Sequence, residues 1–368
     1  MSGRRRPAAG PDPEVIGPLI ARRVREAVAG MLGTPEARRR AGISAGGDPT
    51  YAIDEVAERA VGDVLSGLED VALFTEDRGL VVRGRPAHLF LVDPVDGTRP
   101  AMAGHGSGCV SIAVAPYGED VTMGDVTHAW VVELATGASF AARRGGGRRG
   151  VTVRGGRIAP SGTRSLRGLI WAAGFRGQPA VLLAAALADL FDVPGSEGAF
   201  FDHGSAAYSL TRIATGQLDA YVDPGQRLVE EVPGAEAAFR PVGGGEILNT
   251  TTYDLAAGYL LLRELGCLVT DATGRPLEGI PLIGGDGRAS LVSMVAASGP
   301  DLHAEILRAV DGGIERARRL AAAASEVVLG EAGGGPRTGL TRRAPRRVAP
   351  RRVTPPGGPM DPRGSAQA

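Results

Sequence analysis

Two aspartates at the end of a short apolar run have the residue types and spacing of a hard-cation site. Pro94 restricts the backbone between Asp93 and Asp96, so we expect both carboxylates to face one pocket where a buried strand ends. Mg2+ takes oxygen ligands in near-octahedral geometry and is usually held by carboxylates together with substrate phosphate oxygens. Gly97 and Thr98 follow where a helix would begin, and the free N–H groups there favour a phosphate. A simple turn is the alternative for an isolated pair of this kind.

Two further acidic positions stand at the ends of predicted elements. Glu76 and Asp77 follow a predicted strand over residues 71–75, and Asp254 stands at the start of a predicted helix. Taken alone, an acidic pair on a loop is most often solvated. An Asp at the start of a helix most often caps it, with a contribution of about 1 kcal/mol. His105 has no partner at metal-ligand spacing and is a weak signal.

Three motifs resemble those of the inositol monophosphatase family, which belongs to the Mg2+-dependent, lithium-sensitive type of sugar phosphatases. Residues 93–98, Asp-Pro-Val-Asp-Gly-Thr, match the family's first motif position for position. Residues 204–207, Gly-Ser-Ala-Ala, match the segment that contributes to the sugar or polyol pocket. Residues 253–258 match the second signature, with Tyr253 in place of the usual Trp. The resemblance runs from about residue 14 to residue 320.

The resemblance implies a role for each matched position and a phosphate monoester hydrolase that uses a metal-activated water. Two or three Mg2+ ions would be bound by Glu76, Asp93, the Val95 carbonyl, Asp96 and Asp254. The catalytic residues would be Glu76, Asp96 and Thr98, with Thr98 paired with Glu76 to orient the attacking water. The substrate and its phosphate would contact Gly97, Thr98, Gly204, Ser205, Ala206 and Glu246.

The chain departs from the family pattern in ways that leave the substrate open. Phe-Phe-Asp-His, residues 200–203, stands where family members commonly carry an arginine, and Arg99 follows the first motif. About twenty extra residues, roughly 224–245, precede the second signature. A small sugar, inositol or polyol phosphate is the expected substrate. The alternatives are a 3'(2'),5'-bisphosphate nucleotide, a biosynthetic intermediate or, in a different class, a non-catalytic binding protein with an Arg-rich tail.

The elements that must position these residues follow from hydrophobic periodicity. Helical spacing predicts helices over residues 14–32, 51–68, 179–190 and 204–216, and apolar runs predict strands over residues 109–114, 126–134, 137–142, 168–172 and 218–222. Residues 145–150 satisfy G-x-G-x-x-G, but a predicted strand follows them, so a glycine-rich hairpin is favoured over a dinucleotide site. The resemblance implies alternating layers of helices and sheets, with an α+β metal-binding part over 14–150 and an α/β part over 151–325.

Composition excludes several classes of function. At 368 residues with 43% hydrophobic content, the chain can bury a large core. All 41 basic residues are Arg, so chemistry that needs a lysine, such as a P-loop or a Schiff base, is excluded. The formal net charge is zero and gives no electrostatic argument for binding nucleic acid or a membrane surface. Cys109 and Cys267 lie in apolar contexts that are typical of small buried hydrophobes.

The two ends of the chain are expected to be disordered over residues 1–13 and 326–368. The charged amino terminus lacks the apolar core of a signal peptide. No apolar run reaches the length of about 20 residues that a membrane span needs. Both observations favour a cytoplasmic protein without membrane contact. Residues 331–368 contain eight Arg against one Asp and one Glu and cannot bury enough surface to fold alone. A nucleic-acid contact through this tail is the alternative. The resemblance implies a homodimer.

Overall fold

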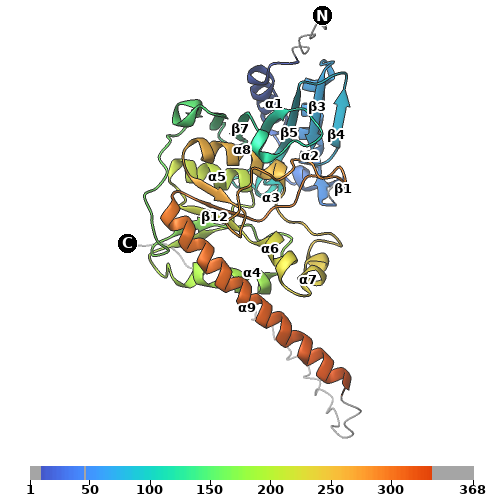
Figure 1. Ribbon diagram of the computed structural model, residues 1–368. Coiled ribbons are helices and arrows are strands. Elements are labelled where there is room, and N and C mark those ends of the chain that lie inside the picture. Colours follow the sequence, from blue (N-terminus) through green and yellow to red (C-terminus); the bar gives the residue numbers. More distant parts are fainter. Residues whose placement is uncertain (1–9, 45–46, 334–368) are drawn as a thin grey trace, which may run out of the picture. The chain divides into compact units, whose positions relative to one another are not determined.

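The computed structural model describes residues 10–44 and 47–333, with side chains as far as residue 323. A seven-stranded sheet forms its amino-terminal half, in the order β4-β3-β5-β6-β7-β8-β9 (Figure 1). β3 and β5 run parallel, and the other neighbours are antiparallel. The strand bounds are β3 (Val71–Thr75), β4 (Gly79–Arg83), β5 (His88–Asp96), β6 (Cys109–Pro116), β7 (His128–Glu133), β8 (Ser139–Arg143) and β9 (Val151–Arg154). A small antiparallel pair, β1 (Arg40–Ile43) and β2 (Pro49–Tyr51), lies outside this sheet.

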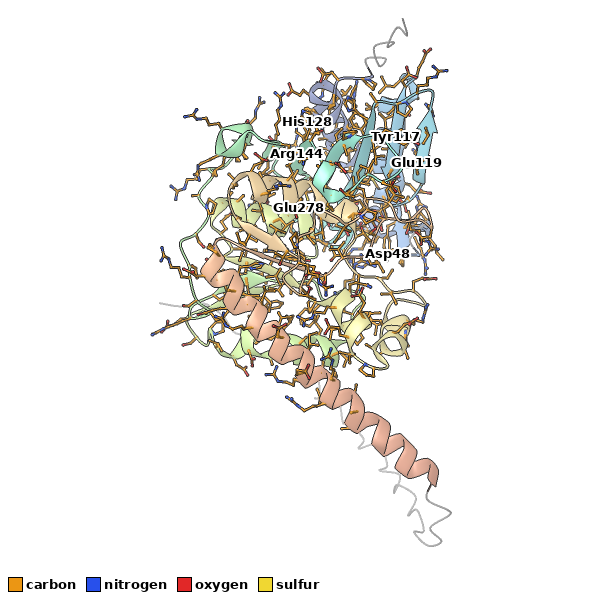
Figure 2. The ribbon with its side chains drawn as sticks, viewed as in Figure 1. Asp48, Tyr117, Glu119, His128, Arg144 and Glu278 are labelled. Carbon is orange, nitrogen blue, oxygen red and sulfur yellow. The ribbon has the colours of Figure 1, made fainter. Side chains whose placement is uncertain are left out.

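Helices α1 (Pro13–Val28) and α2 (Ala52–Ser66) cover one face of this sheet. Their apolar stripes recur at helical spacing and are buried against alternate residues of β3, β5 and β6. Gly17 allows a close approach, since a Cβ there would lie 2.5 Å from the ring of Trp130 on β7. His128, which is labelled in Figure 2, also lies on β7, and its ring stacks on that of Trp130 with centroids 5.9 Å apart. Packing of α1 on β7 therefore depends on the absence of a side chain at residue 17.

The opposite face of the seven-stranded sheet packs against α5 (Ala206–Thr215) and α8 (Thr252–Glu264). These two helices also contact a second sheet, so they form a middle layer between two sheets. Residues 255–262 of α8 are buried in succession, as expected for a helix covered on more than one side. This middle layer begins, at the amino-terminal ends of both helices, beside the carboxylates of β5.

The second sheet has the order β11-β10-β12-β14-β13, and its outer face packs against further helices. Its strands are β10 (Ile170–Ala172), β11 (Ala199–Phe201), β12 (Ala220–Asp223), β13 (Leu268–Thr270) and β14 (Met294–Ala297). The outer helices are α4 (Ala180–Asp192), α6 (Gly225–Glu231), α7 (Ala235–Val242) and α9 (Pro300–Gly333). The layers thus alternate between helices and sheets, which confirms the predicted layered sandwich.

Several local features differ from the sequence-based expectations or refine them. The extra residues before the second signature fold into α6 and α7, which the sequence analysis left without assigned structure. β8 and β9 form the predicted glycine-rich hairpin. The chain is helical from residue 326 to residue 333, inside the segment expected to be disordered. The expectations for residues 1–9 and 334–368 lie outside the described residues. Among the helices that are described, none is both long and apolar enough to span a bilayer.

Candidate active site

A β-bulge in β5 brings the first two carboxylates together. In a regular strand, residues three apart point to opposite faces of the sheet. Asp93 pairs with Ser111 and Asp96 pairs with Cys109, so three steps along β5 oppose two along β6. The extra residue turns both carboxylates to the same side, and Pro94 is tolerated because a bulge leaves one residue unpaired. The sequence predicted a shared pocket at the end of the strand, but β5 continues through Asp96 and the bulge produces the convergence.

The third carboxylate reaches the same place from α8. One oxygen each from Asp93, Asp96 and Asp254 lie within 4.8 Å of one another. Asp254 is the third helical residue, and its Oδ2 accepts hydrogen bonds from the backbone N–H (2.7 Å) and the hydroxyl (2.9 Å) of Thr251, which is the N-cap. Asp254 therefore contributes to a capping box without being the cap itself. We refer to Asp93, Asp96 and Asp254 as the carboxylate cluster.

Protein donors fix one oxygen of each carboxylate in the cluster. Asp93 Oδ1 accepts from the N–H of Val95 at 2.9 Å. Asp96 Oδ2 accepts from the hydroxyl of Ser205 and from the N–H of Ala207, both at 2.7 Å. Together with the Thr251 bonds to Asp254, these contacts orient all three groups.

The start of α5 lies directly behind Asp96. Ser205 is buried and caps α5, and its hydroxyl donates to Asp96. The wall of the pocket includes Gly204 but, in the described part of the chain, neither Ser205 nor Ala206. From this position the Ser205 hydroxyl and the Ala207 N–H hold the Asp96 carboxylate, because the free N–H groups of a helix start favour a negative charge.

Burial and mutual repulsion raise the pKa values of the carboxylates in the cluster. Burial raises the pKa of Asp96 to about 7, and the charge of Asp254 adds to this effect. Burial also raises the pKa of Asp93, with further contributions from Asp96 and Glu76. The pKa of Asp254 is raised by burial in spite of its bonds from Thr251. A divalent cation would offset this repulsion, and a set made only of oxygen donors suits Mg2+.

The remaining metal-site residues of the prediction lie around the cluster. Glu76 follows β3 and lines the same pocket, and burial together with the charge of Asp254 raises its pKa. The Val95 carbonyl accepts a hydrogen bond from the Thr98 hydroxyl at 3.2 Å, and Val95 also lines the pocket. All five predicted ligand positions therefore border one pocket.

Thr98 pairs with a different carboxylate from the one predicted. Its hydroxyl donates to Asp54 Oδ1 at 3.0 Å and not to Glu76. Asp54 stands in the first turn of α2, where its other oxygen accepts from the N–H of Tyr51 at 2.8 Å. Burial raises the pKa of Asp54 to about 7. Asp54 received no role from the sequence, because a contact between residues 44 positions apart has no local pattern.

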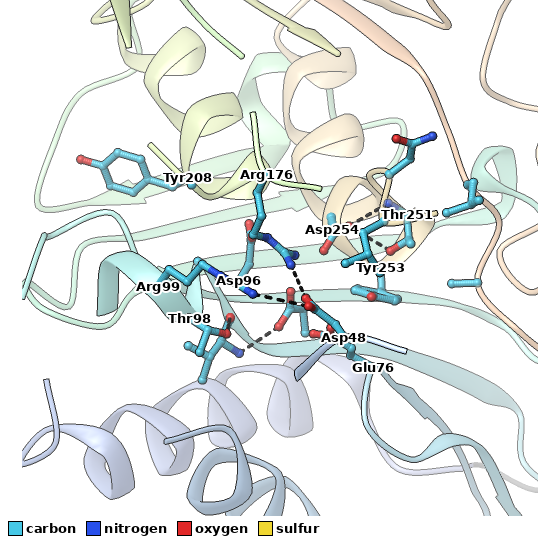
Figure 3. A pocket seen from close by; sticks show the side chains of 18 of the residues that line it. Asp48, Glu76, Asp96, Thr98, Arg99, Arg176, Tyr208, Thr251, Tyr253 and Asp254 are labelled. Carbon is cyan, nitrogen blue, oxygen red and sulfur yellow. Dashed lines mark hydrogen bonds and ion pairs between the residues drawn. The ribbon is translucent and has the colours of Figure 1, made fainter. Parts of the chain in front are cut away.

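Two arginines occupy the pocket near Asp48, and the sequence analysis did not identify their contacts. Arg99 Nη2 lies 3.5 Å from Asp48 Oδ1, and Arg176 forms an ion pair with Asp48 Oδ2 (Figure 3). Arg176 follows β10 in the segment Gly174-Phe-Arg-Gly177. An arginine just after the carboxyl end of a parallel strand was the signal that could have indicated this position.

The pocket has a volume of about 880 Å3 and extends well beyond the cluster. Gly97, at the start of α3 (Thr98–Ala103), has a φ of 87°, and a Cβ there would lie 2.9 Å from the Cβ of Ser205. Glu246, which is exposed, and His105 line the pocket. Its wall also includes Arg240, Ile247, Leu248, Arg288 and Leu291.

The family model described as the inositol monophosphatase family matches residues 17–315. The chain belongs to the inositol monophosphatase family. As a member of this family it is a phosphatase, that is, a phosphoric monoester hydrolase. The three matched motifs all lie at the pocket or directly behind it.

Individual relatives share the fold with modest identity. A fructose-1,6-bisphosphatase/inositol-1-monophosphatase of Methanothermobacter thermautotrophicus is 27% identical over 305 residues, which cover 79% of this chain and 94% of that protein. A bifunctional NADP phosphatase/NAD kinase of Methanocaldococcus jannaschii is 25% identical over 67% of this chain and 42% of its own length. The crystal structure of the extragenic suppressor protein suhB from Bartonella henselae has a TM-score of 0.61 at 20% identity, over 80% of this chain and 96% of that chain. This structural likeness supports the inositol monophosphatase fold.

Proposed function

We propose that this protein is a Mg2+-dependent phosphatase that hydrolyses the phosphate monoester of a small sugar, inositol or polyol. The observation that carries the proposal is the convergence of Asp93, Asp96 and Asp254 within 4.8 Å, at the edge of a pocket of about 880 Å3. Such a set of buried carboxylates would repel a phosphate unless cations neutralised it. The substrate class and the requirement for Mg2+ therefore belong to one hypothesis.

Two or three Mg2+ ions would be held by Glu76, Asp93, the Val95 carbonyl, Asp96 and Asp254. When bound, they would supply Lewis-acid stabilisation of the phosphate and a lowered pKa for the attacking water. The residues that line this side of the pocket come from both parts of the chain, 14–150 and 151–325, which we regard as one functional unit. As the family resemblance implies, we expect a cytoplasmic homodimer.

Asp54 and Thr98 are suited to position the water and to take its proton. The Thr98 hydroxyl donates to Asp54 at 3.0 Å, so its lone pairs can accept a hydrogen bond from a water. As the water oxygen bonds to phosphorus, the bond between phosphorus and the alcohol oxygen breaks, and the leaving alkoxide takes a proton from solvent. The proton of the attacking water passes to Thr98 Oγ1, and the Thr98 proton passes to Asp54. A carboxylate with a pKa of about 7 is matched to this task near neutral pH. The N–H groups of Gly97 and Thr98 would hold a phosphate oxygen.

A nucleotide-type substrate is the second candidate, because the pocket is large. Ligand pockets span roughly 300–1,000 Å3, so about 880 Å3 leaves room beyond a monophosphorylated sugar. Arg240 and Arg288 could bind a second anionic group, and Ile247, Leu248 and Leu291 could contact an apolar ring. The relative named as an NADP phosphatase fits this candidate.

The test is phosphate release from a panel of inositol, sugar, bisphosphate and nucleotide phosphates, with and without Mg2+. We expect release to require Mg2+ and to disappear in Asp93→Asn. The matched control is Asp63→Asn, an exposed aspartate on α2 outside the pocket, which should retain full activity. Release from inositol or sugar phosphates supports the first candidate, and release from nucleotides alone supports the second. Release that persists in Asp93→Asn or with a chelator would overturn the proposal.

A further inference from the structure

Asp48 is shared by two guanidinium groups at the edge of the carboxylate cluster. It is buried, with a relative exposure of 7%, whereas the Arg99 and Arg176 side chains are 39% and 46% exposed. Arg99 comes from α3 and Arg176 from the loop after β10, so the three residues join the two parts of the chain. One carboxylate cannot neutralise two guanidinium groups. The positive charge that Asp48 does not neutralise is therefore available to the neighbouring carboxylates.

Arg176 is the member of this group that faces the metal-site carboxylates. Figure 3 shows its side chain reaching into the pocket toward Asp48, with which it forms an ion pair. Asp48, Glu76 and Asp254 all stabilise its positive charge. The effect is reciprocal, since Arg176 in turn favours the charged forms of Glu76 and Asp254. In the absence of metal, its guanidinium is the counter-ion of these carboxylates.

We propose that Arg176 has two roles, which depend on whether metal is bound. In the metal-free protein its guanidinium competes electrostatically with divalent cations for the carboxylates. When metal is bound, the guanidinium moves from Asp48 to the phosphate of the substrate and binds it. The counter-ion part of this inference is independent of the proposed function, and the phosphate part rests on it. Cations bound to the cluster repel the guanidinium and reduce its attraction to Glu76 and Asp254. The oxygens of a phosphate then offer the bidentate partner that a planar guanidinium binds best.

The proposal predicts opposite changes in two affinities when the charge is removed. Arg176→Gln should bind Mn2+, used as a spectroscopic probe for the cation site, about tenfold more tightly than wild type because a nearby positive charge is lost. The same variant, in saturating Mg2+, should bind inorganic phosphate about tenfold or more weakly because a charge-assisted hydrogen bond is lost. A purely structural role for Arg176 would weaken both affinities together.

The experiment measures Mn2+ affinity by electron paramagnetic resonance and phosphate affinity by calorimetry, on the full-length protein. Arg176→Lys keeps the charge, so its Mn2+ affinity should stay at the wild-type value, while its phosphate affinity should fall because the bidentate fork is lost. The matched control is Arg316→Gln, because Arg316 also forms a half-exposed ion pair, with Asp189 at 2.8 Å, away from the pocket. It should change neither affinity. Thermal unfolding of each variant checks that it is folded.

The outcomes separate this inference from the proposed function. Tighter Mn2+ binding with weaker phosphate binding in Arg176→Gln supports the inference. Unchanged or weaker Mn2+ binding in folded Arg176→Gln overturns it, as does an equal gain in Arg316→Gln. If the wild type binds Mn2+ but neither binds phosphate nor releases it from any substrate, the proposed function fails and the phosphate role of Arg176 fails with it. The Mn2+ comparison would then decide the counter-ion role on its own.

Discussion

The strongest quantitative prediction is that Asp96, as a buried member of the carboxylate cluster, destabilises the metal-free fold at neutral pH. Its folded-state pKa, about 7, lies above the ordinary value of 3.8 for an aspartate, so the folded protein binds the proton more tightly than the unfolded chain. The associated stability is fully present below pH 3.8 and is lost as the pH rises through about 7. At about 1.4 kcal/mol per pKa unit, the loss at pH 8 reaches an upper limit of about 4 kcal/mol. Asp96→Asn should remove this penalty, because an amide oxygen can still accept from Ser205 and Ala207.

The assay is urea unfolding with a chelator present, at pH 5 and pH 8. The free energy of unfolding of the wild type should fall by about 3 kcal/mol more than that of Asp96→Asn over this range. At pH 8 the variant should therefore be the more stable protein, although it is inactive. Added Mg2+ should raise the free energy of unfolding of the wild type by about 2.7 kcal/mol when its concentration is 100 times the dissociation constant for Mg2+. The effect on the variant should be much smaller.

A matched control separates this effect from the general effect of replacing a buried aspartate by asparagine. Asp219 is as well buried as Asp96, at 5% against 6%, but it accepts from the Ile170 N–H at 2.8 Å and from the hydroxyl of Ser161. Asp219→Asn retains only one acceptor oxygen and should lose about 1–3 kcal/mol at either pH. The reasoning is refuted if Asp96→Asn is less stable than wild type at pH 8 without metal, or if both proteins respond equally to pH.

Three further predictions follow from contacts at the site and in the core. Asp54→Asn and Thr98→Val should each lower kcat about 100-fold and leave the affinity for Mg2+ unchanged. In pH–rate profiles, kcat of the wild type should fall below about pH 7, and this fall should be absent in Asp54→Asn. Ser205→Ala removes a hydrogen bond that lowers the pKa of Asp96, so tight Mg2+ binding should require a higher pH in calorimetric titrations. Gly17→Val places a side chain against the indole of Trp130 on β7 and should lower the free energy of unfolding by about 1–3 kcal/mol. In the folded protein, kcat should stay at the wild-type value.

The sequence predicted most of the layered fold because its elements carry local signals. Apolar periodicity located α1, α2 and the central strands, and the family motifs identified the pocket. Two results had no local signal. The start of α5 supports Asp96 through a contact between residues 205 and 96, and Thr98 pairs with Asp54 instead of Glu76. These contacts depend on how layers pack, which spacing along the chain does not specify.

The arginines near Asp48 illustrate the same limit. The sequence showed that the arginine common in the family just before residue 204 is absent. A guanidinium is nevertheless brought into the pocket by Arg176, which follows a different strand, β10. The extra residues before the second signature were also visible, although their fold into α6 and α7 was not predicted. Arg240 of α7 lines the pocket, so this insertion contributes directly to its wall.

The position of α8 between the two sheets has a consequence for synthesis of the protein. The bulge in β5 and the carboxylate supplied by α8 are separated by more than 150 residues. At about 5–20 residues per second, a ribosome needs roughly 8–30 s to make the intervening chain. Strands β6 to β9 are made at the start of this interval, and from then until α8 is made the first sheet lacks this helix, which covers its inner face. The nascent chain therefore exposes an apolar sheet surface that later residues must cover, and a chaperone would have its longest access to the protein at this stage.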